Sequence, residues 1–268
     1  MYLAFLKLCA IAIAMATTQP ARVLHIAADP NNLPFSNDRL EGFENKIAAL
    51  IASDLGAQVE YTWWAQRRGF FRDAVKHGTA ELVLGVPADF ERVIPTRPYY
   101  RFCYVLVYRA DRDLRIRSLD DPQLRKLKIG VPLVGGGNNS PPGQALAERK
   151  IIDNVVGYSV YADYREENPL SRIISDVGSG EIDVAIVWGP LGGYFAKRAS
   201  APLTVVPIES LAFDISVGVK RANPELKKEI EEILVRRKPE IDKILTEYDV
   251  PLLPPRTAQQ SDAKRSTH

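Results

Sequence analysis

Residues 22–64 decide the fold, and they read RVLHIAADPNNLPFSNDRLEGFENKIAALIASDLGAQVEYTWW. The short apolar run Val23–Ala28 predicts a buried strand, and the prolines and asparagines of Asp29–Phe35 predict a loop after it. Apolar residues at helical spacing then predict a helix, which Gly56 suits as a left-handed cap, and Val59–Trp64 predicts a second strand. The helical stripe consists of Phe43, Ile47, Leu50, Ile51 and Leu55.

A strand, a helix and a second strand in this order form a βαβ unit, which imposes a parallel sheet. Ligands of open α/β sheets bind at the carboxyl ends of the strands. We therefore expect the loops Asp29–Phe35 and Trp63–Arg68 to lie side by side over a cleft.

The length and composition are those of a globular protein of two modest α/β lobes or one large domain. The chain has 268 residues, 46% hydrophobic and 25% charged, with a formal net charge of +2. Basic and acidic residues are interspersed, so no basic surface for nucleic acid is predicted.

The first 16 residues differ from the rest. Lys7 is their only charged residue, and Ala14-Met15-Ala16 fits a signal-peptidase site, so we expect a signal peptide over 1–16 and a mature chain beginning at Thr17. The alternative is a short membrane anchor, but the segment is too short to span a bilayer comfortably. Cleavage would leave Cys103 as the only cysteine, so no internal disulfide is expected.

The second half of the chain repeats the strand-and-helix architecture of the first half without repeating its sequence. We expect an α/β protein of two lobes, each a mixed, mostly parallel sheet flanked by helices, with two crossing strands between them. Lobe 1 is expected to comprise 17–111 and 207–252, lobe 2 to comprise 112–206, and 253–268 to form a flexible tail.

Several blocks of sequence resemble the periplasmic solute-binding proteins of family 3, which are the amino-acid receptors of ABC importers. The helix start Gly42-Phe43-Glu44 and the Pro98-Tyr99-Tyr100 ahead of the hinge carry this resemblance. It implies two α/β lobes that close on a ligand by a hinge motion.

The match is closer to one branch of that family, the MxaJ/XoxJ proteins encoded beside PQQ-dependent methanol dehydrogenases. The blocks that carry it are 28–36, 42–48, 61–69, 96–101, 187–191 and 213–216. This resemblance implies a periplasmic accessory protein with a PQQ-dependent methanol or alcohol dehydrogenase as its partner. It leaves the molecular act open.

The resemblance also implies that the two amino-acid clamps of the family are altered. Those receptors hold the ligand carboxylate with a Thr-x-x-Arg element; here Arg92 matches the arginine, but Asp89 stands at the threonine position and could neutralise Arg92. They hold the ammonium with an aspartate, at the position of Trp188 in this chain. The loss of one partner of a buried charge pair costs on the order of 2–5 kcal/mol, so we do not expect α-amino acids to bind.

The expected cleft or its rim could serve a dehydrogenase segment or a small molecule. Core packing is the alternative to cleft lining for Trp63 and Trp64. For Arg67 and Arg68, a solvated surface is the alternative to an ion pair at the cleft mouth or a patch for an anionic partner. The glycine- and asparagine-rich loop 135–143 is expected to be a flexible loop of the cleft, and the alternative is that residues 135–140 cradle an anion with their backbone N–H groups. Alanine at Trp64 and Trp188 is expected to weaken a partner contact and to leave the melting temperature nearly unchanged. The candidate residues are Asp29, Asn31, Phe35, Trp63, Trp64, Arg67, Arg68, Asp89, Arg92, Tyr99, Asn138, Asn139, Trp188 and Tyr194.

The sequence offers little support for catalysis. No cysteine and histidine cluster has metal-ligand spacing, and no Gly-x-Ser-x-Gly motif is present. We therefore expect no enzyme activity, cofactor or metal. The alternatives that remain are a receptor that delivers a small solute other than an amino acid to an ABC importer, and an enzyme of unrecognised type.

Overall fold

The structure is a computed structural model that describes residues 22–66, 69–133, 140–160 and 163–255. The expected signal peptide, Arg67, Arg68, Asn138, Asn139 and the tail from residue 256 onward lie outside the described residues. Among the described helices, none combines the length and the apolar character needed to cross a bilayer.

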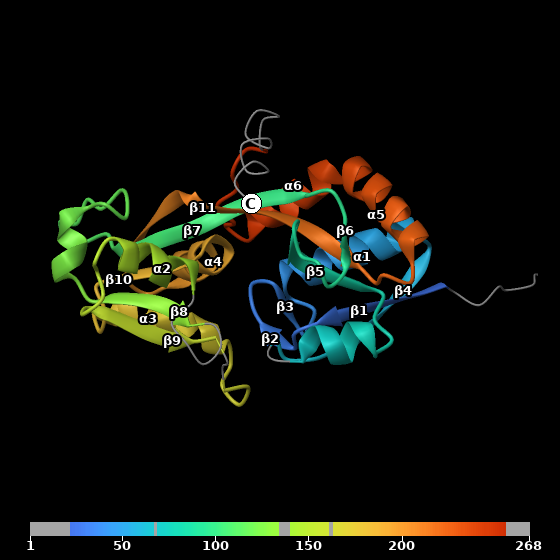
Figure 1. The fold of residues 1–268 in the computed structure, drawn as a ribbon, viewed down its shortest axis with the longest axis horizontal. Coiled ribbons are helices and arrows are strands. Elements are labelled where there is room, and N and C mark those ends of the chain that lie inside the picture. Colours follow the sequence, from blue (N-terminus) through green and yellow to red (C-terminus); the bar gives the residue numbers. More distant parts are fainter. Residues whose placement is uncertain (1–21, 67–68, 134–139, 161–162, 256–268) are drawn as a thin grey trace, which may run out of the picture.

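Two lobes lie side by side, and a pair of long strands runs through both of them (Figure 1). These strands are β7 (Tyr100–Arg109) and β11 (Leu203–Val219), which pair antiparallel along their length. Their register shifts between Ile208 and Ala212, where the chain passes from one lobe to the other. The two crossing strands predicted from the sequence are confirmed.

Lobe 1 follows the predicted βαβ order. Its further elements are β1 (Arg22–Ala28), β2 (Asn31–Asn32), β3 (Ser36–Asn37), α1 (Phe43–Asp54), β4 (Ala57–Trp63), the π-helix η1 (Phe71–Lys76), β5 (Leu82–Pro87), β6 (Ile94–Pro95), α5 (Pro224–Arg236) and α6 (Lys238–Glu247). The strands β4, β1 and β5 are parallel, and β11 pairs antiparallel with β5. The helices α1, α5 and α6 cover one face of this half-sheet with apolar side chains, and η1 covers the other.

Lobe 2 has the same layered construction. Its elements are η2 (Pro122–Lys126), β8 (Ile129–Leu133), α2 (Pro141–Glu148), β9 (Val155–Ser159), η3 (Pro169–Ser171), α3 (Arg172–Ser179), β10 (Val184–Trp188) and α4 (Gly189–Arg198). The strands β10, β8 and β9 are parallel, and β7 pairs antiparallel with β10. Alternate residues of β7 enter the cores on opposite faces of this sheet, against α2 on one side and α3 with α4 on the other.

The cores show where one lobe ends and the other begins. Residues Tyr104–Tyr108 of β7 and Ile208 of β11 belong to the cores of lobe 2, although the predicted boundaries stand at 111/112 and 206/207. We therefore propose that the boundary runs through β7 and β11 at the register shift. A two-lobed sheet that is continuous through the hinge can bend there while each lobe keeps its own core.

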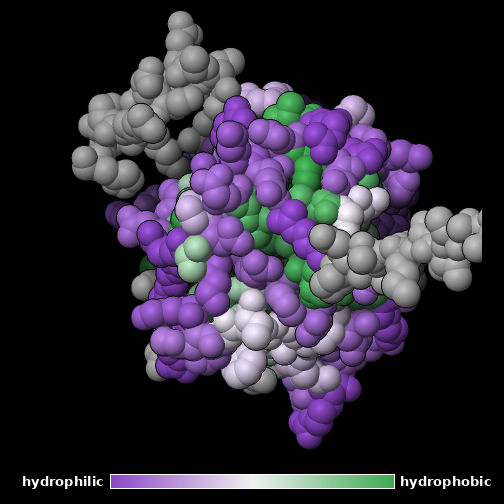
Figure 2. Space-filling model, turned by 90° about the vertical axis from the view of Figure 1, so that its right-hand side faces the viewer, coloured by the Kyte–Doolittle hydropathy of each residue, from purple (hydrophilic) through white to green (hydrophobic). Residues whose placement is uncertain are grey.

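The end face of lobe 1 carries mostly hydrophilic side chains, with hydrophobic ones in narrower patches between them (Figure 2). The large apolar residues that are exposed on the described chain are scattered over both lobes: Val23, Leu40, Trp64, Ile152, Val235 and Leu252. Single exposed apolar residues are ordinary on protein surfaces, so they do not by themselves mark an interface.

Candidate functional site

Asp29 stands at the carboxyl end of β1 and is only 2% exposed. Its carboxylate accepts hydrogen bonds from the backbone N–H of Asn31 at 2.9 Å and of Gln66 at 2.6 Å. It also accepts a hydrogen bond from the hydroxyl of Tyr164, which belongs to lobe 2. The loops after β1 and β4 therefore meet at Asp29, as expected from the βαβ order, and lobe 2 contacts the same carboxylate.

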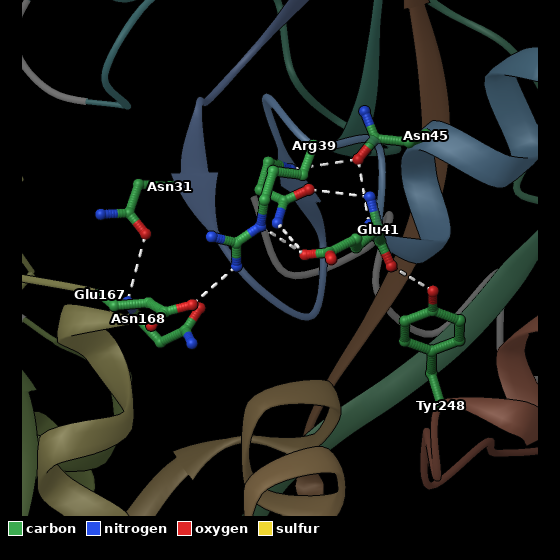
Figure 3. Close-up of polar contacts among 9 residues, drawn as sticks. Asn31, Arg39, Glu41, Asn45, Glu167, Asn168 and Tyr248 are labelled. Atoms are coloured by element: carbon green, nitrogen blue, oxygen red, sulfur yellow. Dashed lines mark hydrogen bonds and ion pairs between the residues drawn. The ribbon is translucent and has the colours of Figure 1, made fainter.

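Further polar contacts between the lobes lie beside this bond, on the loop that carries β2 and β3 (Figure 3). The side chain of Asn31 donates to the carbonyl of Glu166 at 2.8 Å and accepts from the backbone N–H of Asn168 at 3.2 Å. Arg39 reaches Glu167 at 2.7 Å. Both side chains of that ion pair are more than half exposed, so it adds little stability. The hydrogen bonds of Asn31 and Asp29 are therefore the main polar contacts that hold the two lobes together here.

An aromatic contact joins the lobes at a second place. Tyr194 of α4 stacks on Tyr248, which follows α6, with ring centroids 5.6 Å apart and planes 15° from parallel. Arg198 lies over the Tyr194 ring at 3.7 Å and Lys46 over the Tyr248 ring at 4.8 Å, so the stack has a cation on each side. A cavity of about 580 Å³ opens beside it.

Trp188 ends β10 and lies where the cores meet. Its half-buried side chain packs against the core of lobe 1 and against both cores of lobe 2. The indole N–H donates to the hydroxyl of Tyr104, whose pKa is raised mainly by burial. Trp188 also lines a groove of about 830 Å³, formed within lobe 2 by β9, α3 and the start of α4. Trp188 was predicted to line the cleft. In the structure it packs where the three cores meet, and one edge of its side chain also lines a groove.

Glu44, in the first turn of α1, shapes the electrostatics around Asp29. Burial, and to a smaller extent the negative charge of Asp29, together raise the pKa of Glu44 to about 8. A Cβ atom at Gly85 would lie 2.1 Å from the carboxyl oxygen of Glu44, and Gly85 has φ +73°. Glycine at position 85 is therefore what lets the carboxyl pack against the backbone of β5.

The remaining aromatic candidates of lobe 1 differ in how far they are exposed. Phe35 packs against Phe43 with ring centroids 5.3 Å apart, and Trp63 stacks on Tyr61 at 4.5 Å. Trp64 is 41% exposed and has its backbone N–H bonded to Ala28. Of these aromatic residues, Trp64 offers the most exposed surface to a partner.

The predictions for Tyr99, Asp89 and Arg92 need correction or revision. Tyr99 is 3% exposed and belongs to the lobe 1 core, so its predicted place at the cleft rim is wrong: its backbone N–H bonds to Ile215 and turns the ring inward. Asp89 and Arg92 are both exposed on the loop after β5, and no ion pair between them is formed in the described structure. Direct neutralisation of Arg92 by Asp89 is therefore not seen.

The residues of lobe 2 that contact Asp29 and Asn31 are not predicted from the sequence. A loop is indicated by the polar run Asp163-Tyr164-Arg165-Glu166-Glu167-Asn168. The residues of that run give no indication that they contact residues some 135 positions earlier in the chain. Among the described residues, no group of three or more His, Cys, Asp or Glu side chains could hold a metal ion.

Comparisons with known proteins agree with this architecture. No protein-family model matches the chain. Protein MoxJ of Methylorubrum extorquens AM1 is 32% identical over 242 residues, which are 82% of this chain and 79% of that protein. Protein MoxJ of Paracoccus denitrificans is 30% identical over 278 residues, which are 95% of this chain and 99% of that protein.

Comparison with solved structures also finds proteins of this kind. The periplasmic binding protein XoxJ from Methylobacterium extorquens AM1 has a TM-score of 0.72 and 35% identity, with 87% of this chain and all of that chain covered. MxaJ from Methlophaga aminisulfidivorans MPT has a TM-score of 0.75 and 26% identity, with 86% of this chain and all of that chain covered. An ancestral cationic amino acid solute-binding protein, at 22% identity and a TM-score of 0.68, shares the fold. The chain therefore belongs to the MoxJ/MxaJ/XoxJ branch of the family 3 periplasmic solute-binding proteins.

Proposed function

We propose that this protein is a periplasmic accessory of a PQQ-dependent methanol or alcohol dehydrogenase, which it binds or helps to mature through the inter-lobe cleft or its rim. The names of its relatives link the branch to methanol dehydrogenase systems. Export to the periplasm would use residues 1–16 as a cleavable signal peptide.

The observation that carries the proposal is the bond from Tyr164 to Asp29. In an open α/β sheet a ligand is held at the carboxyl ends of the strands, and in this chain a side chain of the opposite lobe occupies the carboxylate at that place. The two lobes thus contact each other directly through these two side chains. A protein closed in this way presents its rim, rather than an empty amino-acid site, to other molecules.

A second candidate function is a receptor for a small solute other than an amino acid. The groove of about 830 Å³ in lobe 2 favours it, because drug-sized ligands occupy pockets of about 300–1,000 Å³. The groove lies within lobe 2, and its lining includes both basic and acidic side chains: Lys128, Arg172, Asp176 and Glu181. Permease and ATPase genes beside this gene would favour the receptor, and dehydrogenase and cytochrome c genes the accessory.

The decisive experiment removes the gene and measures dehydrogenase activity in periplasmic extracts. We expect activity to fall without this protein and to return with it, and we expect the dehydrogenase to co-purify with the tagged wild-type chain. Trp64→Ala should weaken the association, since a large aromatic side chain at a rim is a common anchor of interfaces. Ile152→Ala is the matched control, because Ile152 is an exposed apolar residue of lobe 2 at 63%. Unchanged activity together with no co-purified dehydrogenase would contradict the proposal and would favour the function of a solute receptor.

A further inference from the structure

The chain that follows α6, residues 248–254, forms a contact between the lobes that the proposed function does not use, and we call it the strap. One end of the strap is attached to β7 beside the hinge. Leu252 forms an antiparallel bridge with Phe102, and the backbone N–H of Leu253 donates to the carbonyl of Arg101 at 2.9 Å. These residues of β7 pair with β11 on the lobe 1 side of the register shift. The strap is therefore a part of lobe 1.

The other end of the strap lies against α4 of lobe 2, with no room for a side chain between the two backbones. A Cβ atom at Gly193 would lie 2.0 Å from the carbonyl oxygen of Asp249, and one at Gly189 would lie 2.9 Å from the ring of Pro251. The two glycines are four residues apart, so they share one face of the helix. Glycine at these positions is what lets the backbones approach so closely.

Two further residues of α4 contact the strap through their side chains. Tyr194 stacks on Tyr248, and Arg198 forms an ion pair with Asp249 at 3.3 Å. Both side chains of the ion pair are more than a third exposed, so the pair contributes little. The aromatic stack and the close packing at the glycines are therefore the main attachments of α4 to the strap.

This contact lies between the hinge and the cleft. Toward the hinge, a Cβ atom at Gly189 would also lie 2.6 Å from the carbonyl oxygen of Cys103 in β7. Toward the cleft, Tyr194 lines a cavity together with Asn168, whose backbone N–H donates to a side chain of lobe 1. A rotation of lobe 2 about the hinge that opens the cleft must therefore separate α4 from the strap.

We infer that the strap is a closure device built into the chain: it holds α4, and with it lobe 2, in the closed position through contacts of the protein itself. Opening must separate the two stacked rings and expose the surface that is packed between the strap and α4. A molecule that enters the cleft must therefore first overcome this contact. The device belongs to the protein alone and does not depend on a dehydrogenase.

Gly193→Ala should open the protein. Alanine is the better helix former, so α4 keeps its structure, but the new Cβ would collide with the backbone of Asp249 unless the strap and α4 move apart. Spin labels at Asp38→Cys and Arg165→Cys measure the distance across the cleft, because both residues are exposed on loops that contact each other there. Cys103 is buried. We expect a short distance in the otherwise wild-type chain and a longer one with Gly193→Ala.

Gly192→Ala is the matched control in the same helix. Its Cβ would lie 2.5 Å from the side chain of Val105, which belongs to the core of lobe 2, so this variant should lose stability and keep the short distance. Gly178→Ala should change neither, because the nearest atom to its Cβ is in Ala201 at 3.9 Å. A short distance in Gly193→Ala, or the same lengthening in Gly192→Ala, would overturn the inference.

A second variant covers the case in which Gly193→Ala does not fold. Tyr194→Leu removes one ring of the stack and introduces no collision, so we expect a larger share of long distances than in the otherwise wild-type chain. Phe195→Leu is its control, because Phe195 packs against the core of lobe 2, and it should keep the short distance. A distribution in Tyr194→Leu that matches the one without this substitution would contradict the role of the strap.

Discussion

Trp188→Ala should lower the free energy of unfolding by about 3 kcal/mol, toward the lower end of the range for removal of a tryptophan from a core, because this side chain is only half-buried. The indole packs against the cores of both lobes and donates a hydrogen bond to the hydroxyl of Tyr104. Alanine would leave a cavity at their junction and an unpaired hydroxyl. Urea unfolding followed by circular dichroism would measure the loss.

Trp64→Ala is the natural comparison. Its side chain is 41% exposed, and we expect a loss below about 1 kcal/mol. The sequence alone predicts an almost unchanged melting temperature for both variants, and the structure revises that prediction for Trp188. Equal, small losses in the two variants would contradict the packing described for Trp188.

Asp29→Asn should cost about 2–3 kcal/mol of folding free energy, because hydrogen bonds to a charged acceptor contribute about 1.5–3 kcal/mol. One carboxylate oxygen of Asp29 accepts both the Gln66 N–H and the Tyr164 hydroxyl, and an amide offers only one acceptor oxygen for all of its donors. The measurement belongs at pH 6, where Glu44 is protonated and its repulsion by Asp29 does not enter.

A double-mutant cycle with Tyr164→Phe separates the contribution of the inter-lobe bond between Tyr164 and Asp29 from the rest of the free energy lost in Asp29→Asn. The coupling energy between Asp29 and Tyr164 should be at least about 0.5 kcal/mol, as is usual for residues in direct contact. Asp38→Asn is the control, because Asp38 is exposed on the same loop and its side chain forms no hydrogen bond or ion pair with the described residues of lobe 2. Purely additive losses at Asp29 and Tyr164 would mean that their bond does not hold the lobes together.

The local parts of the fold could be predicted from the sequence because each has its own period. The apolar stripe from Phe43 to Ile51 faces the core as predicted, and Gly56 has φ +60° after α1. Pro239 breaks the C-terminal helical segment into α5 and α6 at Arg237, as its missing N–H requires.

The misplaced and missing parts depend on registers that local patterns do not contain. Tyr99 follows a proline and precedes a long strand, so its sequence fits a rim, but pairing with Ile215 of β11 turns it into the core. The contacts of Asp29 and Asn31 join residues about 135 positions apart, and a single sequence does not show which polar loop faces which. The fold can therefore be predicted from the sequence, but the contacts that join the two lobes at Asp29 and Asn31 cannot.

The central claim is that this chain, with its lobes held together by its own side chains, acts on a protein rather than on an amino acid. Calorimetry of the mature protein tests it most directly, with the twenty amino acids and the methanol dehydrogenase of the same bacterium titrated in turn. We predict saturable heat with the dehydrogenase and no amino acid bound more tightly than about millimolar, about 4 kcal/mol of binding free energy. A micromolar amino acid together with no heat from the dehydrogenase would contradict the claim.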